Sequence, residues 1–181
     1  MGNVPWFWPG VLISVVVGFV AARRLARALE IRAPHAAVLV ISLGVIVAAT
    51  LTPLRDALVS GAVGSGVCDL SRFGPPPLRD LIRLNDTTLN LVLFAPLGAA
   101  IGLVPKGRQR AVLLLLAALL PFGIETTQLL TPVLDRGCQS ADVVDNLTGL
   151  AGGFIAATLW RIFGSARIRR RSPETRSQRD P

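Results

Sequence analysis

Seven polar side chains interrupt the apolar second half of the chain, and their types could support chemistry. They combine carboxylates, carboxamides and one guanidinium: Asn90, Glu125, Gln128, Arg136, Asp142, Asp145 and Asn146. Two carboxylates in different surroundings can act as a general acid and a general base, and an arginine can stabilise developing negative charge. The same set can instead bind a ligand, with Arg136 pairing with an anion and the carboxamides orienting it by hydrogen bonds.

The spacing of these residues predicts that they meet. Asp142, Asp145, Asn146 and Gly149 follow the pattern i, i+3, i+4, i+7, which places them on one face of a helix. Glu125 precedes the end of an apolar run and lies roughly 7 Å from that end along a helix. A carboxylate that faces lipid at the bilayer centre costs on the order of 2.5 to 3.5 kcal/mol. We therefore expect these groups to face one another.

Five apolar segments must position the polar groups. Hydrophobic residues make up 51% of the 181 residues and charged residues only 17%, and the mean hydropathy is +0.56. Each segment approaches the roughly 17 to 25 residues that a helix needs to cross a bilayer. The segments are residues 4–22, 33–54, 87–104, 111–130 and 141–163. The sequence predicts an all-α, polytopic membrane protein of about five transmembrane helices. We expect two helices in residues 1–54, a loop in 55–85, a three-helix core in 86–163 and a disordered basic tail in 164–181.

Basic residues gather on one side of this arrangement. Most of the 19 lysines and arginines lie in residues 23–32, in residues 106–110 and from residue 161 onward. The positive-inside rule predicts an N-terminus outside and a C-terminus inside. The polar groups then lie at the extracytoplasmic side of a bacterial cytoplasmic membrane, where Arg136 and Arg83 are the available counter-charges. Because the charge flanks membrane segments, we expect no nucleic acid as a partner.

The longest loop, residues 55–85, contains the segment "PPPLRDLIRL", which can form a short amphipathic helix entered through Pro77. This helix is either a lid at the membrane surface or a solvated connection, and the sequence leaves both open. Asp86 follows it and is expected to cap the third apolar helix.

Two cysteines fall in loops on the same predicted side. Cys68 lies in the 55–85 loop and Cys138 between the fourth and fifth apolar segments, so the topology places both in an oxidising compartment. We predict a Cys68–Cys138 disulfide that ties the long loop over the bundle. His35 is expected on the opposite side, so we expect no zinc site, and the sequence indicates no cofactor.

The polar residues also fall into three ordered blocks. An N-x-x-x-F-x-P-L-G block at residues 90–98 precedes E-x-x-Q at 125–128, an arginine at 136 and D-x-x-x-N-x-x-G at 142–149. These blocks resemble the VanZ-like membrane protein family, named for a protein associated with low-level resistance to the glycopeptide teicoplanin. The resemblance covers residues 86–163 and implies that the polar residues of the blocks form a functional site. The usual aspartate doublet is split here, so either Asp142 or Asp145 holds the family role.

The leading hypothesis is an envelope protein whose outer-leaflet pocket binds a membrane lipid or a lipid-linked precursor with an acidic headgroup. Arg136 and Arg83 would pair with its phosphate or carboxylate, while Asn90, Gln128 and Asn146 would orient it. Such binding would alter the cell surface and its susceptibility to glycopeptides.

Three alternatives stay open. The chain can be an intramembrane enzyme acting on a lipid-linked wall or glycolipid substrate, with Glu125 as general acid or base and Asp142 or Asp145 as the second carboxylate. It can be an accessory subunit of a membrane-protein complex that docks through its glycine stripes. The polar residues can also be no more than packing contacts between helices.

Overall fold

Five long helices form most of the molecule. The computed structural model describes residues 4–77, 83 and 85–171, and only the helical backbone of residues 165–171. Within these residues the helices long and apolar enough to cross a membrane are α1 (Phe7–Ala28), α2 (Ala33–Thr50), α4 (Asp86–Leu103), α5 (Arg108–Leu130) and α6 (Ser140–Arg171). The apolar part of α6 is Ser140–Gly164. The prediction of a helical, multi-pass membrane protein is confirmed, with five helices that could cross a membrane.

Several helix ends differ from the sequence prediction: α2 ends at Thr50 instead of residue 54, and α6 continues to Arg171, past the predicted end at residue 163. α1 continues six residues beyond the predicted end at residue 22, because the arginines that follow are good helix formers and favour the negative end of the helix dipole. α4 is capped by Asn85, whose side chain accepts a hydrogen bond from the Thr88 amide at 3.0 Å. The prediction that Asp86 is the cap was wrong, because Asn85 has the extended backbone of a cap while Asp86 is already helical.

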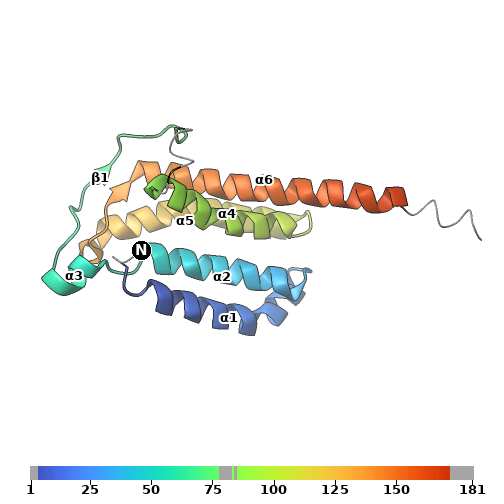
Figure 1. The fold of residues 1–181 in the computed structure, drawn as a ribbon, viewed down its shortest axis with the longest axis horizontal. Coiled ribbons are helices and arrows are strands. Elements are labelled where there is room, and N and C mark those ends of the chain that lie inside the picture. Colours follow the sequence, from blue (N-terminus) through green and yellow to red (C-terminus); the bar gives the residue numbers. More distant parts are fainter. Residues whose placement is uncertain (1–3, 78–82, 84, 172–181) are drawn as a thin grey trace, which may run out of the picture.

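Short elements gather at one end of the bundle (Figure 1). They are α3 (Arg55–Ser60), β1 (Cys68–Asp69), η2 (Pro132–Leu134) and β2 (Cys138–Gln139). β1 and β2 pair in parallel, with Cys68 opposite Cys138. We call this end, with residues 51–77 and 131–139, the loop end. The opposite end, where residues 29–32 and 104–107 turn the chain, is the turn end. The predicted amphipathic helix falls on residues 78–82 and 84, which lie outside the described residues.

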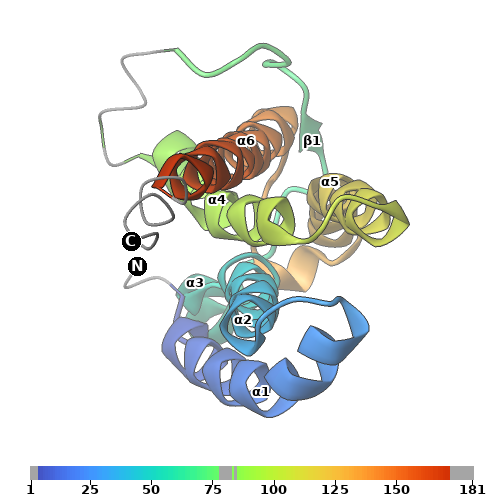
Figure 2. The ribbon, with the colours of Figure 1, turned by 90° about the vertical axis from the view of Figure 1, so that its right-hand side faces the viewer.

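α4 packs along α6, α1 packs along α2, and α2 joins the two pairs by its contact with α4 (Figure 2). Glycines permit the close approach of α4 and α6. A Cβ added at Gly98 would overlap the carbonyl of Leu150, and one added at Gly153 would overlap the carbonyl of Ala95. A Cβ at Gly102 or Gly149 would also come closer than 3 Å to backbone atoms of the opposite helix. The glycine stripes considered above as docking faces therefore pack within the chain.

The apolar core lies between α2, α4, α5 and α6. Ile46, Phe94, Ile101, Val104 and Ile124 are each no more than 1% exposed, and Leu150 belongs to the same cluster. This core fills the middle of the bundle, and the charged side chains of the same helices lie toward its two ends.

Candidate functional site

Polar side chains from three helices and one loop meet at the loop end. We call them the polar cluster: Arg72 after β1, Asn90 of α4, Glu125 of α5, and Asp142, Asp145 and Asn146 of α6. Asp145 and Asn146 are each 1% exposed, and Glu125 is 5% exposed. Buried carboxylates are costly unless they are paired or hydrogen-bonded, so their partners decide what the site can do.

Arg72 is the cation of the polar cluster. Its Nη2 atom lies 2.5 Å from Oδ2 of Asp145 and also donates to the carbonyl of Ala141 at 3.3 Å. The Ser140 hydroxyl in turn donates to the Arg72 carbonyl at 2.7 Å. Both ends of Arg72 are therefore fixed to the first turns of α6. From the sequence, Arg136 and Arg83 were predicted as the counter-charges, and Arg72 was missed.

One sequence signal could have located Arg72. The predicted disulfide joins Cys68 to Cys138, and α6 begins two residues after Cys138. A residue four positions after Cys68 then lies close to the start of α6. An arginine at that position is the natural partner of a buried carboxylate there.

The carboxylates of α5 and α6 share the same space. Asp142 is hydrogen-bonded to the Asn90 side chain and interacts electrostatically with Asp145, Asp86 and Arg72. Glu125 interacts electrostatically with Asp142, and its Oε2 atom accepts a hydrogen bond from the Gln139 amide at 2.7 Å. The site thus holds more carboxylates than cations, which favours ligand groups that donate hydrogen bonds or carry positive charge.

Gln128 and Arg136 donate hydrogen bonds to carbonyl groups at the end of α2. The Gln128 side chain donates to the Thr50 carbonyl at 2.9 Å. Arg136 donates to the Thr52 carbonyl through Nε at 3.2 Å and Nη2 at 3.1 Å. Carbonyls at a helix C-terminus lack intrahelical donors, so these side chains close the end of α2. Burial lowers the pKa of Arg136 from its ordinary value.

Arg83 is exposed on the chain that leads into α4. Its carbonyl accepts a hydrogen bond from the Thr88 hydroxyl at 2.6 Å. The predicted site residues therefore fall into three places: the carboxylates with Asn90 and Asn146, the pair at the end of α2, and Arg83 at the surface.

Two buried acceptor atoms of the polar cluster receive no hydrogen bond from the described residues. They are Oδ1 of Asp145 and Oδ1 of Asn146. Unsatisfied buried acceptors are rare, because each costs about 1 to 3 kcal/mol. Each of these oxygens could accept a hydrogen bond from a ligand hydroxyl or ammonium group.

An apolar groove of about 510 Å³ runs beside the polar cluster, between α4 and α6. It is lined by Pro75, Pro76, Leu91, Val92, Ala95, Thr148, Gly149, Gly152 and Gly153. Leu91 follows Asn90 in α4, and Gly149 comes one helical turn after Asn146 in α6. The groove and the polar cluster are therefore neighbours along the same two helices.

A disulfide joins Cys68 and Cys138, with their Cα atoms 4.5 Å apart, which confirms the predicted pairing. It holds β1 against β2 and places the following residues, including Arg72, over α6. Across residues 4–77, 83 and 85–171, no three histidine, cysteine or acidic side chains group as metal ligands would.

The five apolar helices and the polar cluster are those of a multi-pass membrane protein with a buried polar site at one end. The model of the VanZ/LLP1 family matches residues 39–164, from the first half of α2 to the apolar end of α6. The chain belongs to the VanZ/LLP1 family. The match extends the resemblance found in the motifs to part of α2. No curated protein and no solved structure matches the chain.

Proposed function

We propose that this VanZ/LLP1 membrane protein acts in the cell envelope by binding the headgroup of a lipid-linked ligand at its polar cluster. The observation that carries the proposal is the adjacency of the polar cluster and the apolar groove on α4 and α6. A lipid-linked molecule has both parts, and the groove offers an apolar surface for its tail while the cluster offers polar groups for its head.

The chemistry of the polar cluster supports a headgroup that donates hydrogen bonds, such as a sugar hydroxyl or an ammonium group. Asp145 Oδ1 and Asn146 Oδ1 are buried acceptors that lack donors among the described residues. From the sequence we expected an acidic headgroup held by Arg136, but the Arg136 guanidinium donates to the Thr52 carbonyl. An anion beside Asp142 would meet carboxylates on both neighbouring helices.

The side of the membrane is part of the proposal. The positive-inside rule favours the turn end in the cytoplasm, since the basic residues of α1 and of the α4–α5 turn lie there. The loop end, with its polar cluster and disulfide, then faces outward in a bacterial cytoplasmic membrane, and a disulfide is favoured on that side. A ligand bound there is a component of the outer leaflet, which is how the protein would affect glycopeptide susceptibility.

A second candidate function is an intramembrane enzyme that acts on the same ligand. The specific observation that favours it is the electrostatic contact between Glu125 of α5 and Asp142 of α6. Two interacting carboxylates in different surroundings can divide the roles of general acid and general base. Asp142 faces Asn90 and Arg72, whereas Glu125 faces the Gln139 amide.

Native mass spectrometry of the protein released from bacterial membranes tests the headgroup site. Asp142→Asn removes one carboxylate of the polar cluster, and Asp56→Asn makes the same change at an exposed position of α3. We expect a copurifying lipid-linked species to be lost in Asp142→Asn and retained in Asp56→Asn. Equal retention in both variants would refute a ligand site at the polar cluster.

Glu125→Gln separates binding from catalysis in the same experiment. Glutamine keeps an acceptor for the Gln139 amide, so the fold should be preserved. A bound species of changed mass, accumulating only in this variant, would favour the enzyme. The same species at wild-type mass would favour binding alone.

A further inference from the structure

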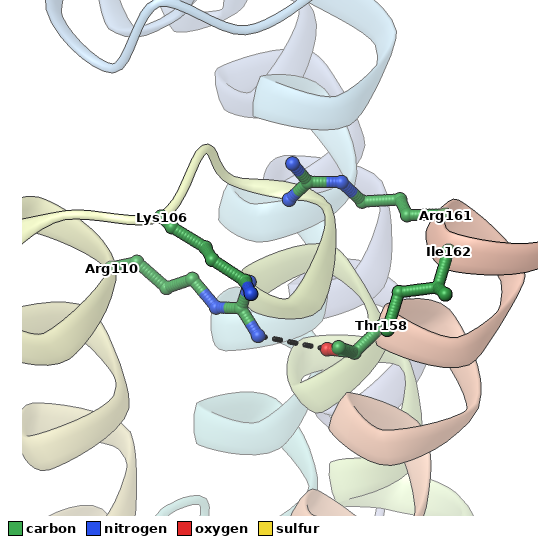
Figure 3. A pocket seen from close by; sticks show the side chains of 5 residues that line it. All are labelled: Lys106, Arg110, Thr158, Arg161 and Ile162. Atoms are coloured by element: carbon green, nitrogen blue, oxygen red, sulfur yellow. Dashed lines mark hydrogen bonds between the residues drawn. The ribbon is translucent and has the colours of Figure 1, made fainter. Parts of the chain in front are cut away.

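A second polar site lies at the turn end, opposite the polar cluster. Three cationic side chains surround a pocket of about 170 Å³ there: Lys106 from the α4–α5 turn, Arg110 from the first turn of α5, and Arg161 from α6. Thr158 and Ile162 complete its lining. Lys106 and Arg110 extend into the pocket from one side, and Arg161 extends from the opposite side (Figure 3).

Arg110 is buried at this site, with 9% of the residue exposed. Its Nη2 atom donates to the Thr158 hydroxyl at 2.8 Å, and its guanidinium lies 4.5 Å from the centre of the Phe154 ring. No carboxylate among the described residues forms an ion pair with Arg110; the ion pair found there joins Arg72 and Asp145. A guanidinium carries five N–H donors, and burying its charge is costly unless an anion compensates it.

Arg161 is held at the edge of the same pocket. Its Nη1 atom donates to the carbonyls of Val104 at 2.6 Å and Gly102 at 3.2 Å, which lie at the end of α4. The charges of Arg161 and Arg110 repel each other. The fold therefore holds two guanidinium groups and the Lys106 ammonium around one space, an arrangement that an anion with several acceptor oxygens would stabilise.

We infer that this basic pocket binds the phosphate group of an anionic phospholipid. Phosphate matches the donor geometry of arginine, and lysine adds a point charge. Exposed apolar side chains share the face of α6 that carries Ile162 at the pocket rim and lie toward the middle of the span: Leu159 and Ile155, three and seven residues earlier. These residues can contact the acyl chains of a lipid whose phosphate is in the pocket, which favours a lipid over a soluble phosphate compound. The site is independent of the polar cluster, which lies at the other end of the bundle.

The only lysine of the sequence, Lys106, provides a site-specific probe. The full chain is placed in nanodiscs of phosphatidylcholine, with or without an equal amount of phosphatidylglycerol. The rate at which an N-hydroxysuccinimide ester acylates Lys106 is then measured by mass spectrometry of peptides. As an internal control, Arg24→Lys introduces a second lysine at an exposed position of α1 near the turn end. This control reports effects of membrane charge that are not specific to the pocket.

We expect phosphatidylglycerol to slow acylation of Lys106 by about fivefold or more relative to the control lysine, as occupancy at about four times Kd would produce. Arg110→Gln should remove this protection. Because Arg110 is buried and its replacement can disturb folding, Ile162→Glu provides a second test at an exposed position on the rim. Its carboxylate would repel the phosphate, so it should also remove the protection.

Equal slowing of both lysines by phosphatidylglycerol, or protection that persists in Ile162→Glu, would overturn the inference. The source of the phosphate is tested by adding inorganic phosphate to nanodiscs of pure phosphatidylcholine. We expect no protection at millimolar concentrations. Protection equal to that given by phosphatidylglycerol would identify a soluble phosphate compound as the ligand and contradict a lipid.

Discussion

Alanine at Gly153 should weaken the packing of α4 against α6, whereas alanine at the neighbouring Gly152 should be tolerated. A Cβ at Gly153 would overlap the carbonyl group of Ala95 in α4 and approach the backbone of Ala99. Backbone atoms cannot rotate away as a side chain does, so α4 and α6 would have to separate. At Gly152 an added Cβ meets nothing within 4 Å.

The expected magnitude follows from two opposing effects. Replacing glycine by alanine within a helix stabilises the helix by about 0.5 to 1 kcal/mol. Inserting a methyl group into a closely packed interface typically costs about 1 to 3 kcal/mol. The first effect is shared by the two consecutive positions, so the free energies of unfolding of Gly152→Ala and Gly153→Ala should differ by about 1 to 3 kcal/mol.

Equilibrium unfolding of the two variants in mixed micelles, followed by circular dichroism, measures this difference. Gly152→Ala should be at least as stable as the unchanged protein, and Gly153→Ala should be less stable than both. Two variants of equal stability would show that α4 and α6 do not approach each other as closely as described. The packing that brings the polar cluster together would then need revision.

Three further predictions concern the loop end and the membrane orientation. Arg72→Ala should lower the free energy of unfolding by about 3 to 5 kcal/mol, because it leaves Asp145 buried without its cation. The double variant Arg72→Met with Asp145→Leu should recover most of this loss in thermal unfolding, and no recovery would contradict a stabilising ion pair. Replacing Cys68 and Cys138 by serine should lower the free energy of unfolding by about 4 kcal/mol, the chain-entropy value for a separation of 70 residues. Denaturant unfolding under oxidising conditions measures this loss, and an unchanged midpoint would count against the disulfide. In intact cells, a membrane-impermeant maleimide should label Ser60→Cys at the loop end and spare Arg24→Cys at the turn end, and the reverse pattern would invert the proposed orientation.

Most of the fold could be predicted from the sequence, because the length of an apolar segment decides whether it can cross a membrane as a helix. Each of the five segments is long enough to cross a bilayer, and each became a helix. The disulfide was also predictable, since the topology brought Cys68 and Cys138 to the same side. The small errors arose where competing local interactions decide, as at Asn85, which caps α4 in place of the neighbouring Asp86.

The side chains that pair with one another in the polar cluster could be predicted only in part. Periodicity placed Asp142, Asp145 and Asn146 on one face of a helix, but it gave no account of a loop residue such as Arg72. The position of Arg72 depends on the disulfide and on contacts across 73 residues of sequence. Gln128 was predicted to orient a ligand by hydrogen bonds, and in the structure its side chain donates to a carbonyl at the end of α2. Sequence spacing does not reveal which helix ends need donors.

We expect the polar cluster and the apolar groove to form one site for one lipid-linked molecule. Gly152→Phe places a ring in the groove without touching the polar cluster, and Gly123→Phe makes the same change on the open face of α5.

Native mass spectrometry of these two variants beside Asp142→Asn distinguishes one shared site from two separate ones. We expect Gly152→Phe and Asp142→Asn to lose the same copurifying species, identified by its mass, and Gly123→Phe to retain it. Loss of different species, or retention in Gly152→Phe, would show that the groove and the polar cluster do not bind one ligand.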